Sequence, residues 1–493
     1  MAAYLGIDVG TSAVKTVLVD ESQRILAEAG ASYGFERPGP LAAEQDPDVW
    51  IDAVEASLAS LARQAPDDYA KTRAIGLSGQ MHGLTVLDKE GKPLRPSMLW
   101  NDGRAHAQAA RLSETRPELC EIAGVLPMPG FTGPKALWLK ENEPEIFERA
   151  RHVMTAKDYV RLWLTGERLT DPSDAAGTWL YDETRQDWSD DILSAVGLSR
   201  SRMPALRESA APAGRLTRQA AARLGLPPGI LVAGGAGDCA AGALGAGVIR
   251  EGQALISLGT GALIFTPTAA CRPAVDSLVH AFRHALPDLW YQMAAMLNGG
   301  SVLAWAATLC GKSPAETAAA VEAAYAGPGD LLFLPYLTGE RTPHNDPHAR
   351  GVLMGLGPKT GGLAIAQAAM EGVAFTLAQA ASLLSGSGAK LLEISIQGGG
   401  AKSLLWTRII AALLEKPLIR RKDQGAGPAF GAARLARMAA TGEPAPAVCA
   451  PPEILDEIAP EPALTAAYAP LYARFRGLYP LLRESFRQAG TNG

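Results

Sequence analysis

The same short motif occurs twice in this chain, once near the N-terminus and once past the middle. Residues 3–9 have the apolar pattern of a buried strand, which enters the turn Gly10-Thr11-Ser12 and leaves it as a second strand over 14–19. Residues 254–265 repeat this order around the turn Gly259-Thr260-Gly261. The two copies lie about 250 residues apart, which is far too long for the units of a solenoid. The sequence therefore predicts two similar domains.

Length and charge narrow the class of protein. A chain of 493 residues is long enough for two or more domains. It carries 46 Lys and Arg against 51 Asp and Glu, a net charge of −5. Nucleic acid or an anionic membrane would demand a broad positive field, which such a chain lacks. We therefore expect neither as a partner.

The cysteines and the N-terminus indicate the cellular compartment in which the protein is expected to work. The five cysteines are scattered and form no CxxC pair, which argues against a zinc or redox motif and is typical of a reducing compartment. The start, MAAYLGIDVG, has neither the basic region nor the long apolar core of a signal peptide. The longest apolar runs are interrupted by Gly and polar residues, so no membrane span is expected. A cytoplasmic enzyme is the prediction.

Helices and strands alternate around the two motifs. We predict helices over 47–64, 361–386 and 401–415, and strands over 73–78, 229–234 and 391–397. The proline-containing stretch 204–228 is expected to hold surface connections, and the Pro/Ala-rich stretch 443–464 is expected to be a linker or a wrapped loop. The tail from Tyr468 to Phe486 has a helical apolar stripe, which Pro470 and Pro480 should kink or segment.

The turn that follows Asp8 has the chemistry of a phosphate-binding loop. Small residues at 10–12 leave backbone N–H groups free to grip phosphate oxygens, with Lys15 nearby. Asp8 at the strand end is suited to hold Mg²⁺, directly or through water. A plain β-hairpin turn is the alternative. The second copy favours phosphate binding, because two facing loops can clamp one polyphosphate.

Asp238 is a candidate catalytic base. It follows Gly234-Gly235-Ala236-Gly237, where small residues let a substrate approach its carboxylate closely. A helix N-cap is an equally good interpretation of its position. The run 235–240 also matches a loose dinucleotide-binding pattern, but it lies at mid-chain and lacks the acidic residue that should follow about 20 positions later.

Three further segments offer ligand chemistry. Gly398-Gly399-Gly400, between a predicted strand and helix, permits close approach of a flat or anionic ligand, or forms a tight turn. Gln80-Met81-His82-Gly83 and Trp100-Asn101-Asp102-Gly103-Arg104 supply donors, acceptors and an aromatic wall suited to a small polyol.

In combination, these motifs resemble the FGGY carbohydrate kinase family over nearly the whole chain. The matching stretches are GIDVGTSAVK (6–15), EQDPDVW (44–50), GQMHG (79–83), LWNDGR (99–104), MPGFTGPKALW (128–138), KDYVRLWLTGE (157–167), SDAAGTW (173–179), AAGALGAG (240–247), SLGTG (257–261), LPYLTGERTPHNDPHARG (334–351), EGVAF (371–375) and GGGAKS (398–403). GQMHG together with LWNDGR favours the members that act on xylulose over those that act on glycerol, gluconate or ribulose.

The resemblance implies a fold and a set of roles. The fold is α/β, a two-domain actin-like ATPase (ribonuclease H-like) fold with a catalytic cleft between the domains. The expected parts are an N-terminal domain over 1–247, a C-terminal domain over 248–440, and a connection with a helical tail over 441–493. By this resemblance Asp238 is the catalytic base and Asp8 lies near the phosphates, both serving Mg²⁺. The residues expected to bind the sugar are Met81, His82, Trp100, Asn101, Asp238 and Cys239. Those expected to bind ATP are Gly10, Thr11, Ser12, Lys15, Gly259, Thr260, Gly261, Gly399, Gly400 and Ala401.

The implied activity is ATP-dependent phosphorylation of D-xylulose to D-xylulose 5-phosphate. The chain departs from the family at three positions: Cys239 replaces the usual Asn, Gly261 a Ser, and Ala136 a larger apolar residue. Because that Asn is expected to help hold the sugar, a kinase for another ketopentose or a polyol remains an alternative. An actin-like ATPase without sugar chemistry is a more remote one. The resemblance makes a homodimer unsurprising, but no interface can be read from the residues.

Overall fold

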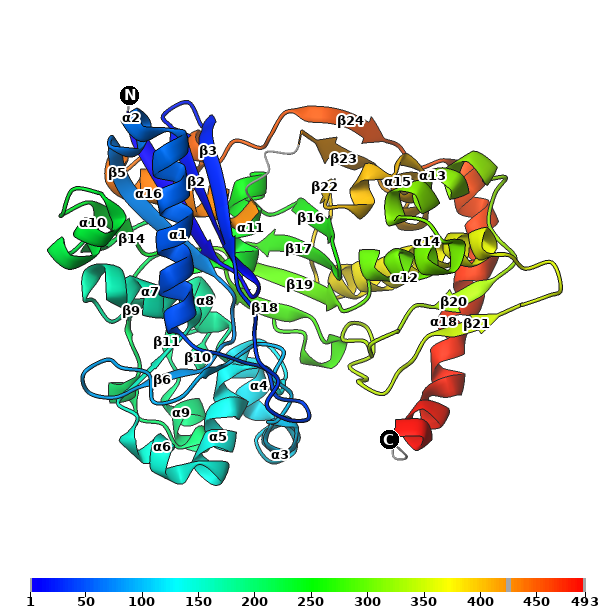
Figure 1. Ribbon diagram of the computed structural model, residues 1–493. Coiled ribbons are helices and arrows are strands. Elements are labelled where there is room, and N and C mark those ends of the chain that lie inside the picture. Colours follow the sequence, from blue (N-terminus) through cyan, green and yellow to red (C-terminus); the bar gives the residue numbers. More distant parts are fainter. Residues whose placement is uncertain (1, 423–426, 491–493) are drawn as a thin grey trace.

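The computed structural model describes residues 2–422 and 427–490, and it is built around two mixed sheets (Figure 1). The first sheet comprises β1 (Ala3–Val9), β2 (Ala13–Asp20), β3 (Ile25–Ser32), β5 (Thr72–Gly79), β13 (Pro212–Arg215), β14 (Leu231–Ala233) and β15 (Ala236–Gly237). The second comprises β16 (Gln253–Leu258), β17 (Ala262–Thr268), β18 (His280–Arg283), β19 (Trp290–Met296), β22 (Glu393–Gln397), β23 (Leu418–Arg421) and β24 (Ile454–Ile458).

The two sheets have the same internal order. In the first the strands run β3-β2-β1-β5-β14-β13, and in the second β19-β17-β16-β22-β23-β24. The senses agree as well: each sheet has an antiparallel meander of three strands, then two parallel neighbours, then an antiparallel strand. The paired motifs thus correspond to β1–β2 and β16–β17, and the prediction of two related halves is confirmed.

Buried strands and the helices that cover them form the core of each sheet. Every residue of β1 is buried, as its continuous apolar pattern predicts. The first sheet packs against α1 (Asp48–Gln64), α7 (Ala156–Thr165) and α10 (Arg218–Leu224). The second packs against α12 (Gly300–Cys310), α14 (Gly362–Gly386), α15 (Leu404–Leu414) and α18 (Pro462–Gly490). The predicted helices and strands at these places are confirmed, with ends shifted by a few residues.

Helix α14 is the single helix in the described chain that is long and apolar enough to cross a membrane, by length and composition alone. Most of it is buried against β20 (Leu332–Leu334), α12 and α15, where it serves as a core helix of the second half. A buried core helix meets the same test of length and hydropathy, so its composition is explained by packing.

Helix α16 (Gly427–Thr441) comes late in the chain but packs on the first sheet (Figure 1). Two glycines make this contact close. A Cβ at Gly6 of β1 would lie 1.9 Å from the Ala429 oxygen, and one at Gly76 of β5 would lie 1.8 Å from the Ala432 oxygen. On its other side α16 meets α11 (Asp238–Ala246), where a Cβ at Gly431 would lie 1.8 Å from the Ala241 oxygen. Only glycine permits these separations.

Three expectations about irregular segments need correction. Residues 204–228 are not only surface connection, because they contain β13 and α10. The stretch 443–464 is not a linker: β24 lies within it and pairs antiparallel with β23, completing the second sheet. The tail is not segmented, since α18 runs through both prolines as one helix. Its predicted packing role is confirmed, because Tyr468 and Phe475 are buried in the second core.

Candidate active site

Three parallel strands end at one edge of the first sheet and bring the candidate residues together. In the register of β1 on β5, Asp8 lies opposite Ser78, and in that of β15 on β5, Ala236 lies opposite the same Ser78. Parallel strands place their carboxyl ends at a common edge. Asp8, the segment Gln80–His82 and Asp238 therefore converge, although they lie far apart in the sequence.

Asp8 is a buried carboxylate that lies close to a second negative charge. It is 8% exposed, and its Oδ1 has no hydrogen-bond partner among the described residues. Burial, and then the charge of Asp238, raise the pKa of Asp8 to about 7, while Ser78 and Lys15 act in the opposite direction. A lone buried oxygen beside a second carboxylate is the donor set that a hard divalent cation prefers.

Asp238 is the first residue of α11, and it does not cap that helix. The N-cap position is occupied by Gly237, with no side-chain cap, so the alternative of an aspartate cap is wrong. Its Oδ1 accepts a hydrogen bond from the Cys239 backbone N–H at 2.7 Å. Burial raises the pKa of Asp238, and a carboxylate with a raised pKa is a better proton acceptor.

His82 is held as a neutral ring in an apolar wall. Its backbone has a positive φ of 70°, and its Nδ1 meets the Gly177 carbonyl oxygen. The ring lies on Phe131, with centroids 4.5 Å apart. Burial lowers the pKa of His82 well below its usual value. A neutral imidazole that donates through Nδ1 to a carbonyl keeps Nε2 as an acceptor.

Met81 is packed directly beneath the turn that carries Asp238. A Cβ at Gly237 would lie 2.7 Å from the Met81 sulfur, and one at Gly177 would lie 2.5 Å from its Cε. A side chain at either position would therefore require Met81 to move. The small residues before Asp238, which suggested substrate access in the sequence, also make room for this side chain.

Trp100 links the sugar-type motif to the first phosphate-type loop. Its Nε1 donates to Thr11 Oγ1 at 2.9 Å, and Thr11 Oγ1 in turn donates to Gln80 Oε1 at 3.2 Å. The Thr11 hydroxyl is thus engaged in positioning Trp100 and Gln80. Next to Trp100, Asn101 Oδ1 is buried without a hydrogen-bond partner in the described part of the chain.

The two glycine turns differ in the residues that they expose and in the contacts that support them. Ser12 and Lys15 are exposed at the first, and Thr260 is exposed at the second. The second turn is braced by the N-terminus of α12, where the Gly300 N–H donates to the Gly259 oxygen at 2.6 Å. A Cβ at Gly261 would lie 2.7 Å from the Met296 oxygen, which explains why glycine is suited to this position.

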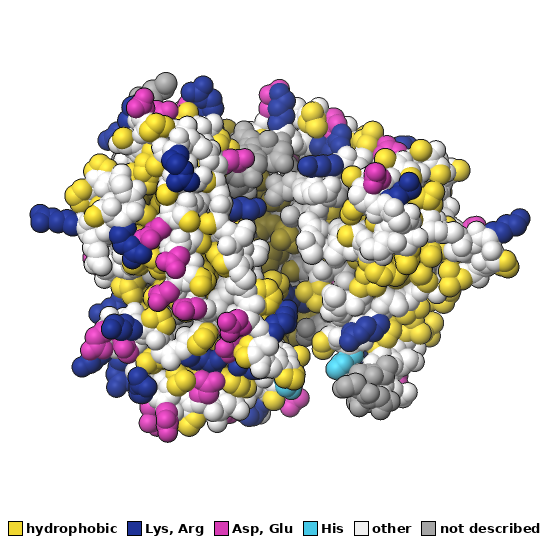
Figure 2. Space-filling view, viewed as in Figure 1, with side chains coloured by type: hydrophobic (Ala, Val, Ile, Leu, Met, Phe, Trp, Pro, Cys, Tyr) yellow, Lys and Arg dark blue, Asp and Glu magenta, His cyan; other side chains and the backbone are white. Residues whose placement is uncertain are grey.

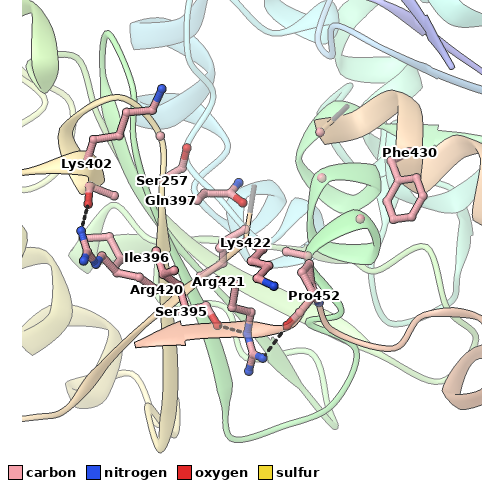
Figure 3. Close-up of a pocket in the computed structure, with 18 residues that line it drawn as sticks. Ser257, Ser395, Ile396, Gln397, Lys402, Arg420, Arg421, Lys422, Phe430 and Pro452 are labelled. Carbon is pink, nitrogen blue, oxygen red and sulfur yellow. Dashed lines mark hydrogen bonds between the residues drawn. The ribbon is translucent and has the colours of Figure 1, made fainter. Parts of the chain in front are cut away.

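A cavity of about 510 Å³ lies between the two halves (Figure 3). The space-filling view shows the molecule hollowed between its two lobes (Figure 2). On one side the cavity is lined by α11 and α16, and on the other by β16, β22 and β23. Of the predicted ATP-binding residues after β22, Ala401 lines the cavity, whereas Gly400 packs on Leu258 and Gly399 is exposed.

Sequence reasoning missed most of this cavity wall. The missed lining residues include Gln397, Arg420, Arg421, Lys422 and Phe430. Arg421 is held by Ser395 Oγ and the Pro452 oxygen, and Arg420 donates to the Ala401 oxygen at 3.3 Å (Figure 3). The basic cluster RRK at 420–422 was a local signal, but its approach to α16 results from tertiary packing.

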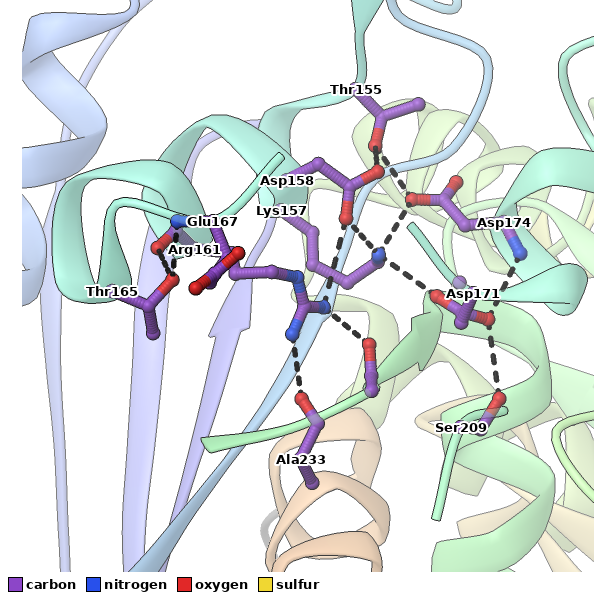
Figure 4. A network of polar contacts seen from close by, with 12 residues as sticks. Thr155, Lys157, Asp158, Arg161, Thr165, Glu167, Asp171, Asp174, Ser209 and Ala233 are labelled. Atoms are coloured by element: carbon purple, nitrogen blue, oxygen red, sulfur yellow. Dashed lines mark hydrogen bonds and ion pairs between the residues drawn. The ribbon is translucent and has the colours of Figure 1, made fainter. Parts of the chain in front are cut away.

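A second missed feature is a buried charge cluster around Lys157 (Figure 4). Lys157 is fully buried and forms ion pairs with Asp158, Asp171 and Asp174. Asp171 accepts from Ser173 Oγ, which itself accepts the Gly237 N–H at 3.1 Å. Because Gly237 immediately precedes Asp238, this cluster supports the turn from which the candidate base projects.

The comparisons with known proteins agree with this geometry. The FGGY family of carbohydrate kinases, N-terminal domain, matches residues 3–245, and the C-terminal domain of that family matches 254–440. A xylulose kinase from Escherichia coli (strain K12) is 42% identical over 98% of each chain. A crystal structure of a "xyloylose kinase" from Brucella ovis superposes with a TM-score of 0.94, at 42% identity over 98% of this chain and 99% of that one. A gluconate kinase from Lactobacillus acidophilus has a TM-score of 0.92 at 27% identity, over 99% of each chain.

Fold, site and comparisons together define the class of protein. Two α/β halves of the same strand order, with a cavity between them and the carboxylates of Asp8 and Asp238 at one edge of the first sheet, place the chain among the two-domain sugar kinases. More specifically, the chain belongs to the FGGY family of carbohydrate kinases.

Proposed function

We propose that this enzyme transfers the γ-phosphoryl group of MgATP to the 5-hydroxyl of D-xylulose, giving D-xylulose 5-phosphate and ADP. The observation that carries the proposal is the convergence of Asp8, Asp238 and the segment Gln80–His82 at one sheet edge, in a chain whose full-length relatives are named xylulose kinases.

The ketose is proposed to lie on Met81, His82, Trp100 and Asn101, within reach of Asp238. His82, neutral with Nε2 as acceptor, takes a hydrogen bond from a sugar hydroxyl. Asp238 accepts the proton of the 5-hydroxyl as that oxygen forms its bond to the γ-phosphorus, and the bond from the γ-phosphorus to the β,γ-bridging oxygen breaks. Phosphoryl transfer needs mainly positioning and neutralisation of charge, which suits this arrangement.

The nucleotide is proposed to span both halves. Its base and ribose occupy the cavity of about 510 Å³, and its phosphates lie between Gly10–Ser12 and Gly259–Gly261. Backbone N–H groups in such turns favour anions. Asp8 and Asp238 would hold Mg²⁺, which when bound neutralises phosphate charge. Asp8 Oδ1, which has no hydrogen-bond partner among the described residues, fits that role. Within the described ranges no larger cluster of His, Cys, Asp or Glu suits a metal.

The test is sugar-dependent ADP release with MgATP and a panel of D-xylulose, L-xylulose, D-ribulose, L-ribulose, glycerol, gluconate and xylitol. We expect selective turnover of D-xylulose. ADP release that no sugar stimulates, from folded protein, would overturn the proposal in favour of an actin-like ATPase without sugar chemistry. The cytoplasmic location, the homodimer and the three domain bounds remain predictions.

Cys239 favours a second candidate, a kinase of the same family for another ketopentose or a polyol. Its thiol lies beside Asp238, in the region proposed for the sugar, and burial raises the pKa of the thiol well above its usual value. A neutral thiol is a weak hydrogen-bond donor compared with an amide. If another sugar in the panel is preferred, and Cys239→Asn moves that preference toward D-xylulose, the second candidate is supported.

A further inference from the structure

One arginine of the second half reaches the sugar side of the first half. Arg341 lies in the segment between β20 and β21 (Val352–Met354), yet its guanidinium lies over the Trp100 ring, 5.3 Å from the centroid. A cation over an indole face is a favourable contact, and it joins the two halves at the proposed sugar pocket.

The guanidinium of Arg341 has its N–H donors available for a ligand, as far as residues 2–422 and 427–490 are concerned. In the described part of the chain, no hydrogen bond or ion pair joins the side chain of Arg341 to another residue, although its backbone N–H donates to Glu340. Burial lowers the pKa of Arg341, while the charge of Glu340 acts in the opposite direction. Burial lowers the pKa of both His82 and His280, and the charge of Arg341 lowers both further, so Arg341 lies within electrostatic range of the two rings. An arginine carries five N–H donors in a fixed fork.

The backbone of Arg341 is anchored to the support of the second glycine turn. Glu340 accepts hydrogen bonds from Leu297 N, Asn298 Nδ2 and Arg341 N. The next residues along from Asn298 are Gly299 and Gly300, which donate to the Thr260 and Gly259 oxygens of that turn. Arg341 is therefore a fixed extension of the second half and not a free surface side chain.

On the other side of the contact, Trp100 is tied to the first glycine turn through Thr11 Oγ1. A chain of contacts thus runs from Gly259 and Thr260, through Glu340 and Arg341, to Trp100 and Thr11. A ligand that meets Arg341 meets both halves at once.

We infer that Arg341 is a sugar-binding residue contributed by the second half, which donates hydrogen bonds to oxygens of the bound ketose. The inference rests on the proposed function. Beside Cys239, whose thiol is a weak donor, the guanidinium supplies the donors that a polyhydroxylated substrate needs. Because the sugar then bridges the two halves, its binding favours the arrangement in which both glycine turns face the triphosphate.

The experiment measures steady-state ADP release by Arg341→Ala and Arg341→Lys, with the sugar and MgATP varied separately. Loss of charge-assisted hydrogen bonds predicts a KM for the preferred sugar raised about tenfold to a hundredfold in Arg341→Ala, with the KM for ATP within about twofold. Arg341→Lys keeps the charge but loses the fork, and recovers part of the loss. An unchanged KM for ATP shows that the variant is folded. If Arg341 had a purely structural role, its loss would change the KM for ATP as well.

Arg350 provides the matched control, because it lies in the same segment but is exposed. Arg350→Ala should leave both KM values unchanged. A sugar KM in Arg341→Ala equal to that of the unaltered chain would overturn this inference alone, since the unaltered chain would still phosphorylate its sugar. Equal rises in both KM values would also overturn it. An unaltered chain that no sugar stimulates would overturn the proposed function, and this inference with it.

Discussion

Asp238 lies close enough to Asp8 for its negative charge to act with burial and raise the pKa of Asp8 to about 7. The two residues are separated by most of the first half of the sequence, and the parallel strands β1, β5 and β15 bring them to one edge. Such pairs of carboxylates are costly without a cation, and they are typical of functional sites.

This pair predicts a stability cost that depends on pH. A carboxyl whose pKa is raised on folding binds its proton more tightly in the folded state, so stability is lost as the pH rises from about 4 to 7. In metal-free protein, Asp8→Asn should therefore increase the free energy of unfolding at pH 8 by about 1–4 kcal/mol, and change it little at pH 4.

Urea unfolding in a chelator at both pH values provides the measurement, with the exposed Asp67→Asn as control. Adding Mg²⁺ at pH 8 should stabilise the unaltered chain but not the variant. A variant that is less stable than the unaltered chain at pH 8 would contradict the account in which the buried charge of Asp8 destabilises the metal-free protein and binds Mg²⁺.

The close approach of α16 to the first sheet predicts that Gly76 does not tolerate substitution by a larger residue. At Gly76 a methyl group would lie 1.8 Å from the Ala432 oxygen, so helix and sheet would have to separate. We expect Gly76→Ala to destabilise the protein by about 2–4 kcal/mol, as overpacking of a core contact does. Gly34→Ala is the control, because nothing lies within 4 Å of its Cβ position. The measurement is the thermal unfolding midpoint of each variant. Equal midpoints for Gly76→Ala and Gly34→Ala would contradict the close contact between α16 and β5.

The buried cluster around Lys157 predicts a large effect from one cation (Figure 4). Lys157→Met would leave Asp158, Asp171 and Asp174 in mutual repulsion without their shared partner. Removing one member of a buried ion pair costs about 3–5 kcal/mol, and the turn that carries Asp238 should lose activity with it.

The control is Lys390→Met, since Lys390 forms an exposed ion pair with Glu251. We expect less than about 1 kcal/mol from the loss of this surface pair. The measurement is the free energy of unfolding in urea, together with kcat. Similar costs for the two lysine variants would show that the buried cluster is not a structural support.

The sequence allowed the strand edges and their loops to be predicted, because those signals are local. A run of apolar residues, a small-residue turn and a second run define β1–β2 and β16–β17 without reference to the rest of the chain. The convergence of Asp8 with Asp238 followed from the family resemblance, and the register of β1, β5 and β15 supplies its physical cause.

Long-range packing could not be predicted in the same way. The position of α16 depends on glycines in β1 and β5. These glycines lie more than 350 residues earlier in the chain. Residues 454–458 lie in a Pro/Ala-rich stretch, and they form a strand only because β23 offers an edge. Arg341 was part of a recognised motif, but its contact with Trp100 joins segments that no local pattern relates.

The most direct test of the account compares the unaltered chain with Asp238→Asn in sugar-dependent ADP release, with ATP binding measured on the same samples. Asparagine keeps the shape of the side chain but cannot accept the hydroxyl proton. Loss of a general base predicts a kcat lower by about 10²–10⁴-fold, with ATP affinity unchanged within about twofold. A near-normal kcat in Asp238→Asn would contradict the role of Asp238 as the base, and with it the proposed mechanism.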